Sequence, residues 1–198
     1  MVTPVSEFNN SFPLNSLGLA HRFIAEHVHP GDFCIDATAG RGRDTVFLCE
    51  LVGPQGRVLA MDIQPQATEA TQALAAQHGF SDIAEVVCDS HSNLLQYAQP
   101  ETVQCIVFNF GWLPGGDHHC FTRPETSIPA IEAGLKLLCP DGLMSLCIYS
   151  GGTNGYTERD TLLSYLETLD PTQYTVIVAR FSNRHGDPPI PVFIIKRG

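Results

Sequence analysis

The 198-residue sequence has no apolar run long enough to cross a membrane. A transmembrane helix needs about 18 or more consecutive apolar residues, and no stretch of the chain approaches that length. Its beginning, MVTPVSEFNNSFP, has no basic segment followed by an apolar one, which argues against a secretory signal peptide. We therefore expect a flexible leader at residues 1–13 and no contact with a membrane.

The sequence also lacks the cysteine spacing of a disulfide framework or a zinc site. The seven cysteines are an odd number, and no two of them form a C-x-x-C pair. Four lie within apolar runs, which predicts small, buried, reduced thiols; these are Cys34, Cys88, Cys105 and Cys147. Reduced thiols in turn predict a cytoplasmic location. The letters DHHC at 117–120 could contribute to a metal site, but no matching second pair of ligands is evident, so we expect no metal.

Basic residues are scarce as well. Only 11 Lys and Arg side chains accompany 21 Asp and Glu side chains, which gives a formal net charge of −10. This charge disfavours loose, charge-driven binding of nucleic acid, although it leaves room for a local basic rim. With 43% hydrophobic and 16% charged residues, the chain has the composition of a globular protein, and its length predicts a single domain over residues 1–198.

Strand and helix patterns alternate along the chain. Strands are predicted at 33–39, 57–63, 84–89, 103–110, 143–150, 174–182 and 192–197. Helices are predicted at 14–28 with Asn15 or Ser16 as cap, at 43–52, from Pro65 to Gly79, from Pro124 along an apolar stripe that reaches Leu138, and at 157–169. The central strands are apolar on both faces, and no helix separates the last two. The pattern therefore predicts an α/β fold with a mostly parallel seven-stranded sheet, helices on both faces and a C-terminal antiparallel hairpin.

The glycine loop after the first predicted strand is a candidate ligand site, because ligands bind beyond the carboxyl ends of parallel strands. In DATAGRGRD, residues 36–44, Gly40 and Gly42 allow a tight turn and a close approach by a ligand. Thr45 occupies the third glycine position of a dinucleotide fingerprint, so a pyrophosphate is not specified. Asp36 suits a cation such as a sulfonium, or it holds the loop by hydrogen bonds alone.

The next two predicted strands also end in polar residues. Asp62 could accept both ribose hydroxyls of an adenosine, or it could cap the helix that begins at Pro65. Ser90 lies where an adenine edge would lie, or it caps the segment that follows. The candidate cofactor-binding residues are Asp36, Thr38, Ala39, Gly40, Arg41, Gly42, Asp44, Asp62, Ile63, Gln64, Asp89, Ser90, His91 and Asn109.

Together, these strand ends resemble those of the class I S-adenosylmethionine-dependent methyltransferases. The shared features are a glycine loop after strand one, an acid after strand two, a polar end on strand three and an aromatic motif after strand four. The C-terminal hairpin is similar too. The resemblance implies a Rossmann-like class I methyltransferase fold with S-adenosylmethionine as cofactor. The alternatives are an NAD-binding dehydrogenase and a domain that binds S-adenosylmethionine or a nucleotide without turnover.

The motif NFGW at 109–112 ends the fourth predicted strand and resembles the Asn-Pro-Pro-aromatic motif of amino methyltransferases. The side-chain oxygen of Asn109 and the carbonyl of Phe110 can orient an amine so that its lone pair faces the methyl group. Trp112 can stack on the ring that carries the amine. Alternatively, Asn109 only holds the loop and Trp112 fills the core. Deprotonation of the acceptor could be assisted by Asp117, His118 or His91.

Longer motifs are similar to those of a bacterial family known as rRNA methylases, whose members include tRNA 5-aminomethyl-2-thiouridine methyltransferases. These motifs are DATAGRGRDTVFL, DIQ, DSH, NFGWLPGGD and RPETS. The resemblance extends from about Leu17 to Arg197, with Arg41 standing where the family usually has Asn. It implies N-methylation of the wobble aminomethyl group in the anticodon loop of tRNA, and rRNA or a small-molecule amine are the alternative acceptors.

The resemblance also implies where catalysis and substrate binding occur. The candidate catalytic residues are Asn109, Trp112 and Asp117, and the candidate substrate-binding residues are Phe110, Trp112, Leu113, Pro114 and Arg123. Arg123 could contact a phosphate of the RNA. Equally, RPET could be a helix start, with Pro124 at the first position and Glu125 favoured by the helix dipole. We also allow for a homodimer.

Overall fold

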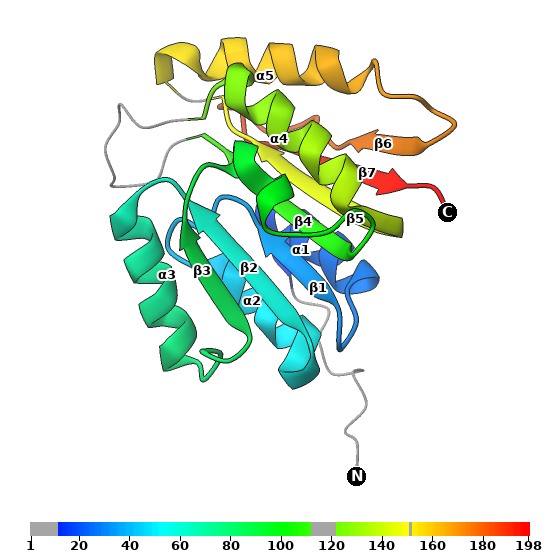
Figure 1. Ribbon diagram of the computed structural model, residues 1–198. Coiled ribbons are helices and arrows are strands. Elements are labelled where there is room, and N and C mark those ends of the chain that lie inside the picture. The colour runs from blue at the N-terminus through cyan, green and yellow to red at the C-terminus, as the bar shows by residue number, and fades with distance from the viewer. Residues whose placement is uncertain (1–11, 112–121, 151) are drawn as a thin grey trace.

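The computed structural model describes residues 12–111, 122–150 and 152–198, whose strands form one seven-stranded sheet (Figure 1). The strands are β1 (Phe33–Asp36), β2 (Arg57–Asp62), β3 (Ala84–Cys88), β4 (Val103–Phe110), β5 (Leu138–Ile148), β6 (Tyr174–Val178) and β7 (Ile190–Lys196). The helices are α1 (Ser16–His27), α2 (Arg43–Val52), α3 (Pro65–Gln77), α4 (Pro124–Leu137) and α5 (Gly152–Leu166), with the short 3₁₀ helices η1 (Gly53–Gln55) and η2 (His91–Gln96).

The strand order is β3-β2-β1-β4-β5-β7-β6. Strands β1 to β5 run parallel, and β7 is antiparallel to both of its neighbours, β5 and β6. The arrows of β1 to β5 accordingly point the same way in Figure 1. This arrangement confirms the predicted mostly parallel sheet and its C-terminal hairpin. The order reverses between β1 and β4, which is where open α/β sheets bind their ligands.

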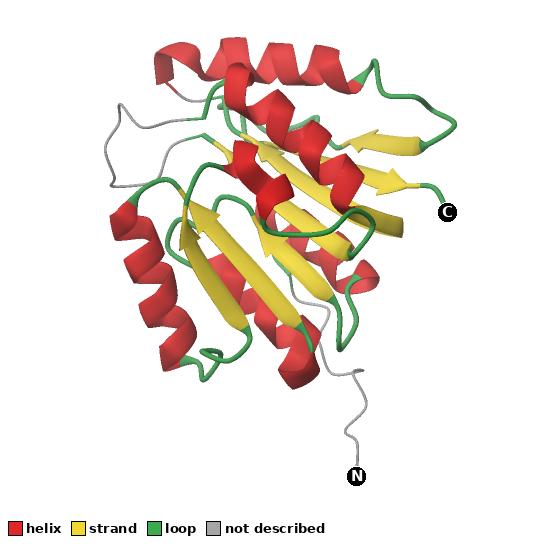
Figure 2. Cartoon of the chain, in the orientation of Figure 1, coloured by secondary structure: helices red, strands yellow, loops and turns green. Residues whose placement is uncertain are grey.

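Helices cover both faces of the sheet (Figure 2). One core lies under α1 and α2, and the other lies under α4, α5 and η2. Strand β4 supplies both: Cys105 and Val107 face the α1–α2 side, whereas Ile106, Phe108 and Phe110 face the α4 side. Because side chains alternate along a strand, residue 109 faces the α1–α2 side, like residue 107.

The structure corrects several predicted boundaries. Strand β5 begins at Leu138, which pairs with Val103 before a register shift, so Leu138 belongs to the sheet and not to the helical stripe. Helix α5 begins earlier than predicted, at residue 152, and β6 ends at Val178. The cap of α1 is Asn15, whose side-chain oxygen accepts a hydrogen bond from the backbone N–H of Gly18 at 2.8 Å.

Three of the four thiols expected to be buried are buried, namely Cys34, Cys105 and Cys147. The prediction is wrong for Cys88, which is exposed. Strand β3 is at the edge of the sheet and pairs only with β2, so its apolar run does not indicate burial on both faces. Within the described ranges, no helix is both long and apolar enough to span a membrane.

Candidate functional site

The candidate site lies where β1, β2, β3 and β4 end, and hydrogen bonds join these four ends. The backbone N–H of Asn109, on β4, donates to the hydroxyl of Thr38, after β1, at 2.7 Å. The N–H of Gly40 donates to a carboxylate oxygen of Asp62 at 3.0 Å. The N–H of Asp89 donates to the carbonyl of Asp62 at 3.1 Å. The predicted cofactor-binding residues therefore share one edge of the sheet.

Asp36 is fully buried at the end of β1. It accepts hydrogen bonds from the hydroxyl of Thr45 at 2.6 Å and from the N–H of Thr38 at 3.3 Å. Burial, with a further contribution from the Asp44 carboxylate, raises the pKa of Asp36 from 3.8 to about 7. The structure thus favours the interpretation in which Asp36 holds the loop by hydrogen bonds. The buried Asp36 carboxylate would then act on a bound cation only through its electrostatic field, without direct contact.

The glycine loop is held tightly against α3. Gly40 and Gly42 have positive φ angles of 54° and 78°. A Cβ atom on Gly42 would lie 2.8 Å from the Cα atom of Thr71, so no larger residue fits without displacing α3. The hydroxyl of Thr71 donates to the carbonyl of Gly40 at 3.3 Å. Arg41 lies exposed between the two glycines.

Asp62 ties the glycine loop to the end of β2. One carboxylate oxygen accepts from the N–H of Gly40, and the other accepts from the N–H of Gln64 at 2.9 Å. The N-cap residue of α3 is Gln64, with no side-chain capping bond, so the interpretation of Asp62 as the helix cap is wrong. Each oxygen keeps a lone pair for a ligand hydroxyl, and the apolar side chain of Ile63, 62% exposed, lies next in sequence.

The end of β3 carries a local polar cluster. Asp89 accepts hydrogen bonds from the N–H of Ser90 at 2.7 Å, the amide of Asn93 at 2.9 Å and the hydroxyl of Tyr97 at 2.7 Å. The bond from Tyr97 is the main cause that lowers the pKa of Asp89. Ser90 caps η2 by accepting from the N–H of Ser92, which supports the capping interpretation.

His91 is largely desolvated beside β4. Its ring lies edge-on to Phe108 and Phe110, with both centroids at 6.1 Å. Burial lowers the pKa of His91 to about 4, so the imidazole is neutral near pH 7 and is a weak base. Its Nε2 atom is buried without a hydrogen-bond partner in the described chain. Its low basicity makes His91 a poor candidate for deprotonating an acceptor amine.

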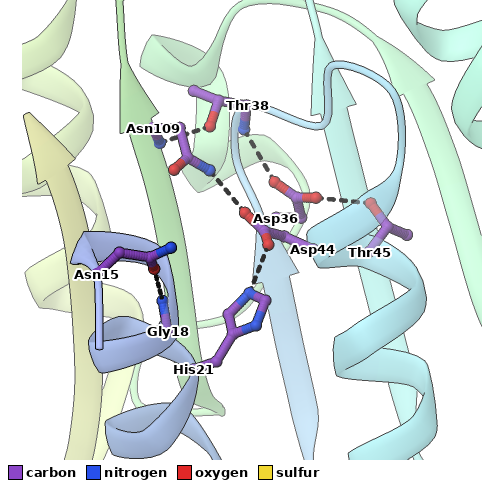
Figure 3. A network of polar contacts seen from close by, with 8 residues as sticks. All are labelled: Asn15, Gly18, His21, Asp36, Thr38, Asp44, Thr45 and Asn109. Atoms are coloured by element: carbon purple, nitrogen blue, oxygen red, sulfur yellow. Dashed lines mark hydrogen bonds and ion pairs between the residues drawn. The ribbon is translucent and has the colours of Figure 1, made fainter. Parts of the chain in front are cut away.

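Asn109 is the end point of a side-chain network that crosses three elements (Figure 3). Its Nδ2 atom donates to Oδ2 of Asp44, on α2, at 2.7 Å. The other oxygen of Asp44 lies 2.8 Å from Nε2 of His21, on α1. The His21 ring stacks on Phe47 with 4.0 Å between centroids. Sequence reasoning missed His21, because no local pattern places residue 21 beside the end of β4.

The chain after Asn109 is only partly described. The side chain of Phe110 is fully buried, and its carbonyl accepts from the N–H of Tyr149 at 3.0 Å, which leaves one lone pair for a substrate. The carbonyl of Gly111 accepts a hydrogen bond from the N–H of Thr122 at 3.0 Å. Four predicted site residues, Trp112, Leu113, Pro114 and Asp117, lie outside the described residues, as does the DHHC sequence.

Arg123 precedes α4 as its N-cap residue and is exposed, without a side-chain capping bond. Pro124 occupies the first turn of α4 together with Glu125, so the helix-start interpretation of RPET is confirmed. Among the described residues there is no group of three or more His, Cys, Asp or Glu that could hold a metal ion.

The residues at this edge fit a nucleoside that carries a positive charge. Asp62 offers lone pairs for ribose hydroxyls, and Ile63 offers an exposed apolar surface for a base. The Asp44 carboxylate lies near enough to Asp36 to contribute to the raised pKa of Asp36, and the two acidic side chains favour a cation over a diphosphate. S-adenosylmethionine combines these features, since it is an adenosine with a sulfonium.

Comparisons with known proteins agree with this chemistry. Residues 58–195 match the family described as "Putative rRNA methylase". The chloroplastic tRNA (mnm(5)s(2)U34)-methyltransferase of Arabidopsis thaliana is 34% identical over 191 residues, which are 90% of this chain and 68% of that protein.

Two solved structures are similar over nearly the whole chain. A "putative rRNA-methylase" from Clostridium thermocellum has a TM-score of 0.90 and 39% identity, covering 92% of this chain and 97% of that one. A "putative methyltransferase" from Streptococcus mutans, in complex with SAH, has a TM-score of 0.83 and 30% identity, covering 92% and 98%.

Proposed function

Because the chain belongs to the family described as "Putative rRNA methylase" and is an S-adenosylmethionine-dependent methyltransferase, we propose that it N-methylates the aminomethyl group of wobble 5-aminomethyl-2-thiouridine in tRNA. The observation that carries the proposal is the fixed Asn109 amide at the end of β4. Its Nδ2 atom is bound to Asp44, so its Oδ1 atom is the end that can accept a hydrogen bond from an amine.

The protein's task in this reaction is orientation. S-adenosylmethionine supplies a methyl group on a sulfonium, which is a good leaving group. The acceptor amine must be neutral and must point its lone pair in line with the methyl group. Hydrogen bonds from the amine to Oδ1 of Asn109 and to the remaining lone pair of the Phe110 carbonyl would direct its N–H groups away from that line.

The cofactor would be held by the ends of β1 and β2. We propose that Asp62 binds the ribose hydroxyls of S-adenosylmethionine and that Ile63 packs on its adenine. The backbone of Gly40–Gly42 would lie alongside the same cofactor. Asp36 supports this loop from inside and contributes negative field when ionised.

A tRNA substrate must approach a protein with a net charge of −10, so contacts must be local. Arg41 and Arg123 are both exposed at the edge of the sheet where the site lies, and they are the proposed phosphate contacts. An anticodon loop presents unpaired bases, so no duplex has to be opened. We also propose a reducing, cytoplasmic location, in keeping with free thiols at Cys34, Cys105 and Cys147. A homodimer stays a prediction.

The direct test is to incubate the purified protein with S-adenosylmethionine and tRNA that carries 5-aminomethyl-2-thiouridine, then to analyse the nucleosides by mass spectrometry. We expect the modified nucleoside to gain one methyl group. A protein that binds S-adenosylhomocysteine but leaves this nucleoside unchanged would contradict the proposal.

The acidic charge favours a second candidate, a small-molecule amine as acceptor. The two candidates differ in their dependence on RNA. Methylation that persists when tRNA is replaced by free small amines, and that is not lost on ribonuclease treatment, would support the second. Strict dependence on intact tRNA would exclude it.

A further inference from the structure

We infer that Asp44 and His21 are positioning residues that fix the Asn109 amide with its oxygen toward the acceptor, an inference that rests on the proposed function. The chain of contacts runs from α1 through α2 to the end of β4 (Figure 3). It contains two short bonds, 2.8 Å from His21 to Asp44 and 2.7 Å from Asn109 to Asp44.

Asp44 decides which way the amide of Asn109 faces. An ionised carboxylate only accepts hydrogen bonds, whereas the Asn side chain has one end that donates and one that accepts. The donor end, Nδ2, must therefore face Asp44. The reversed amide would set its oxygen against a carboxylate oxygen at hydrogen-bond distance, where two negative partial charges repel each other.

His21 holds Asp44 in the position that this task requires. Its Nε2 atom donates to Oδ1 of Asp44, so both carboxylate oxygens are engaged and the carboxylate cannot rotate freely. The His21 ring is itself held, because it stacks on Phe47, one turn after Asp44, and meets the edge of Phe12. The side chains of His21 and Asp44 are only 16% and 12% exposed, so solvent screens the pair weakly.

The backbone of Asn109 is fixed independently of its side chain. Its N–H donates to the hydroxyl of Thr38 at 2.7 Å, which joins β4 to the loop after β1. Rotation of the amide is therefore the main freedom left at residue 109, and Asp44 removes it. The same bond also improves the amide as an acceptor, because donation to an anion polarises the amide and increases the negative charge on Oδ1.

This role differs from the direct cofactor contact that the sequence predicts for Asp44. Both of its oxygens already bind side chains of the protein, whereas Asp62 binds backbone amides of the ligand loop. We therefore expect Asp44 to act through Asn109. Its loss should change turnover and leave the affinity for the cofactor intact.

The informative variant is Asp44→Asn, which keeps the shape but can face Asn109 with either an oxygen or an NH₂ group. We expect kcat to fall roughly tenfold to a hundredfold, because misplaced reacting groups cost factors of this size. The Kd for S-adenosylhomocysteine and the KM for S-adenosylmethionine should stay within about twofold. His21→Ala should lower kcat less, and His21→Gln, which retains a donor, should restore most of it.

Two matched control variants replace a carboxylate and an imidazole that lie outside the site. Asp82→Asn neutralises an exposed carboxylate, and His78→Gln replaces an exposed imidazole, both outside the site. Both should leave kcat unchanged. An Asp44→Asn variant that loses cofactor affinity as much as turnover would overturn the inference, because Asp44 would then contact the cofactor. Unchanged turnover in Asp44→Asn would overturn it as well.

A measurement that needs no activity separates this inference from the proposed function. The side-chain NH₂ of Asn109 can be observed by ¹⁵N NMR and assigned by its absence in Asn109→Asp. In the wild type, we expect one amide proton to be shifted downfield and protected from exchange by the bond to Asp44. Asp44→Asn should weaken that signature, because a neutral amide oxygen replaces the carboxylate or an NH₂ group faces Asn109, and Asp82→Asn should keep it. A signature that is absent from the wild type, or unaffected by Asp44→Asn, would refute the fixed amide, whichever acceptor the enzyme methylates.

Discussion

The two halves of the site are built in different ways. The half at β1 and β2 is fixed by one carboxylate that binds backbone amides: Asp62 reaches Gln64, two residues away, and Gly40, 22 residues away. The half at β4 is fixed by side chains from distant elements, since Asn109 is 65 residues from Asp44 and 71 from Thr38. In the proposed function, the first half, here called the cofactor half, would hold the methyl donor, and the second, the acceptor half, would orient the acceptor amine.

The largest effect should come from Asn109→Ala, which tests the acceptor half. Removal of the amide should lower kcat about a hundredfold or more, because the amine loses its orienting acceptor. The Kd for S-adenosylhomocysteine, measured by calorimetry, should change by less than about threefold. Equal losses of cofactor affinity and turnover would mean that the two halves are not separate.

Asp62→Ala tests the cofactor half, where we expect cofactor affinity to change more than turnover. It should weaken binding of S-adenosylhomocysteine roughly tenfold to a hundredfold, since the ligand loses an acceptor and the N–H groups of Gly40 and Gln64 lose their partner. Calorimetry is the measurement, and Asp82→Asn is the matched control. Retained affinity would remove Asp62 from the proposed ribose contact.

Gly42→Ala tests how rigidly the glycine loop is packed. The new Cβ atom would approach the Cα atom of Thr71 to 2.8 Å at a positive φ, so we expect a loss of about 2 kcal/mol in the free energy of unfolding. Gly53→Ala is the matched control, because Gly53 also has a positive φ but a Cβ atom there meets nothing within 4 Å. If the free energy of unfolding falls equally in both variants, backbone strain at a positive φ alone explains the loss, and the contact with Thr71 contributes nothing.

The buried carboxyl of Asp36 should make stability depend on pH. Its pKa is raised from 3.8 to about 7, so between these values the folded protein binds a proton that the unfolded chain does not. Stability should therefore fall as pH rises through this window and level off above it. Asp36→Asn cannot titrate, so its stability relative to the wild type should grow with pH through the same window. Denaturant titrations at several pH values measure this, and a constant difference would contradict it.

The smallest effect is expected for Ile63→Ser, which removes an exposed apolar contact proposed for the adenine. We expect binding of S-adenosylhomocysteine to weaken only about twofold to fivefold, and kcat at saturating cofactor to stay unchanged. Leu95→Ser is a matched control, because Leu95 is an exposed apolar residue on η2 that has no proposed role. An equal effect of both variants would argue against a specific contact at Ile63.

The same contrast explains what the sequence could predict. The strands of the parallel sheet and the turn glycines depend on local patterns, so their positions could be inferred directly from the sequence. The predictions were wrong where burial or strand pairing depends on neighbouring strands. Cys88 is exposed because β3 is an edge strand, and Leu138 belongs to β5 because it pairs with Val103.

The acceptor half was predictable only in part. Asn109 follows from the motif at the end of β4, but its partner His21 does not, because the contact depends on how α1 packs beside α2. The capping alternative for Ser90 proved correct and that for Asp62 did not, although both are polar residues after a strand. The backbone N–H that each of these side chains binds depends on how the chain folds around it, and the local sequence does not specify this.

The alternating faces of β4 limit how this enzyme can change during evolution. Asn109 stands between two buried phenyl rings, Phe108 and Phe110, which face the opposite core. A deletion or insertion of a single residue within this strand would turn the amide into that core and bring a benzyl group to the acceptor. Substitutions can therefore accumulate along β4, whereas insertions or deletions in the part of β4 that precedes residue 109 should be eliminated by selection.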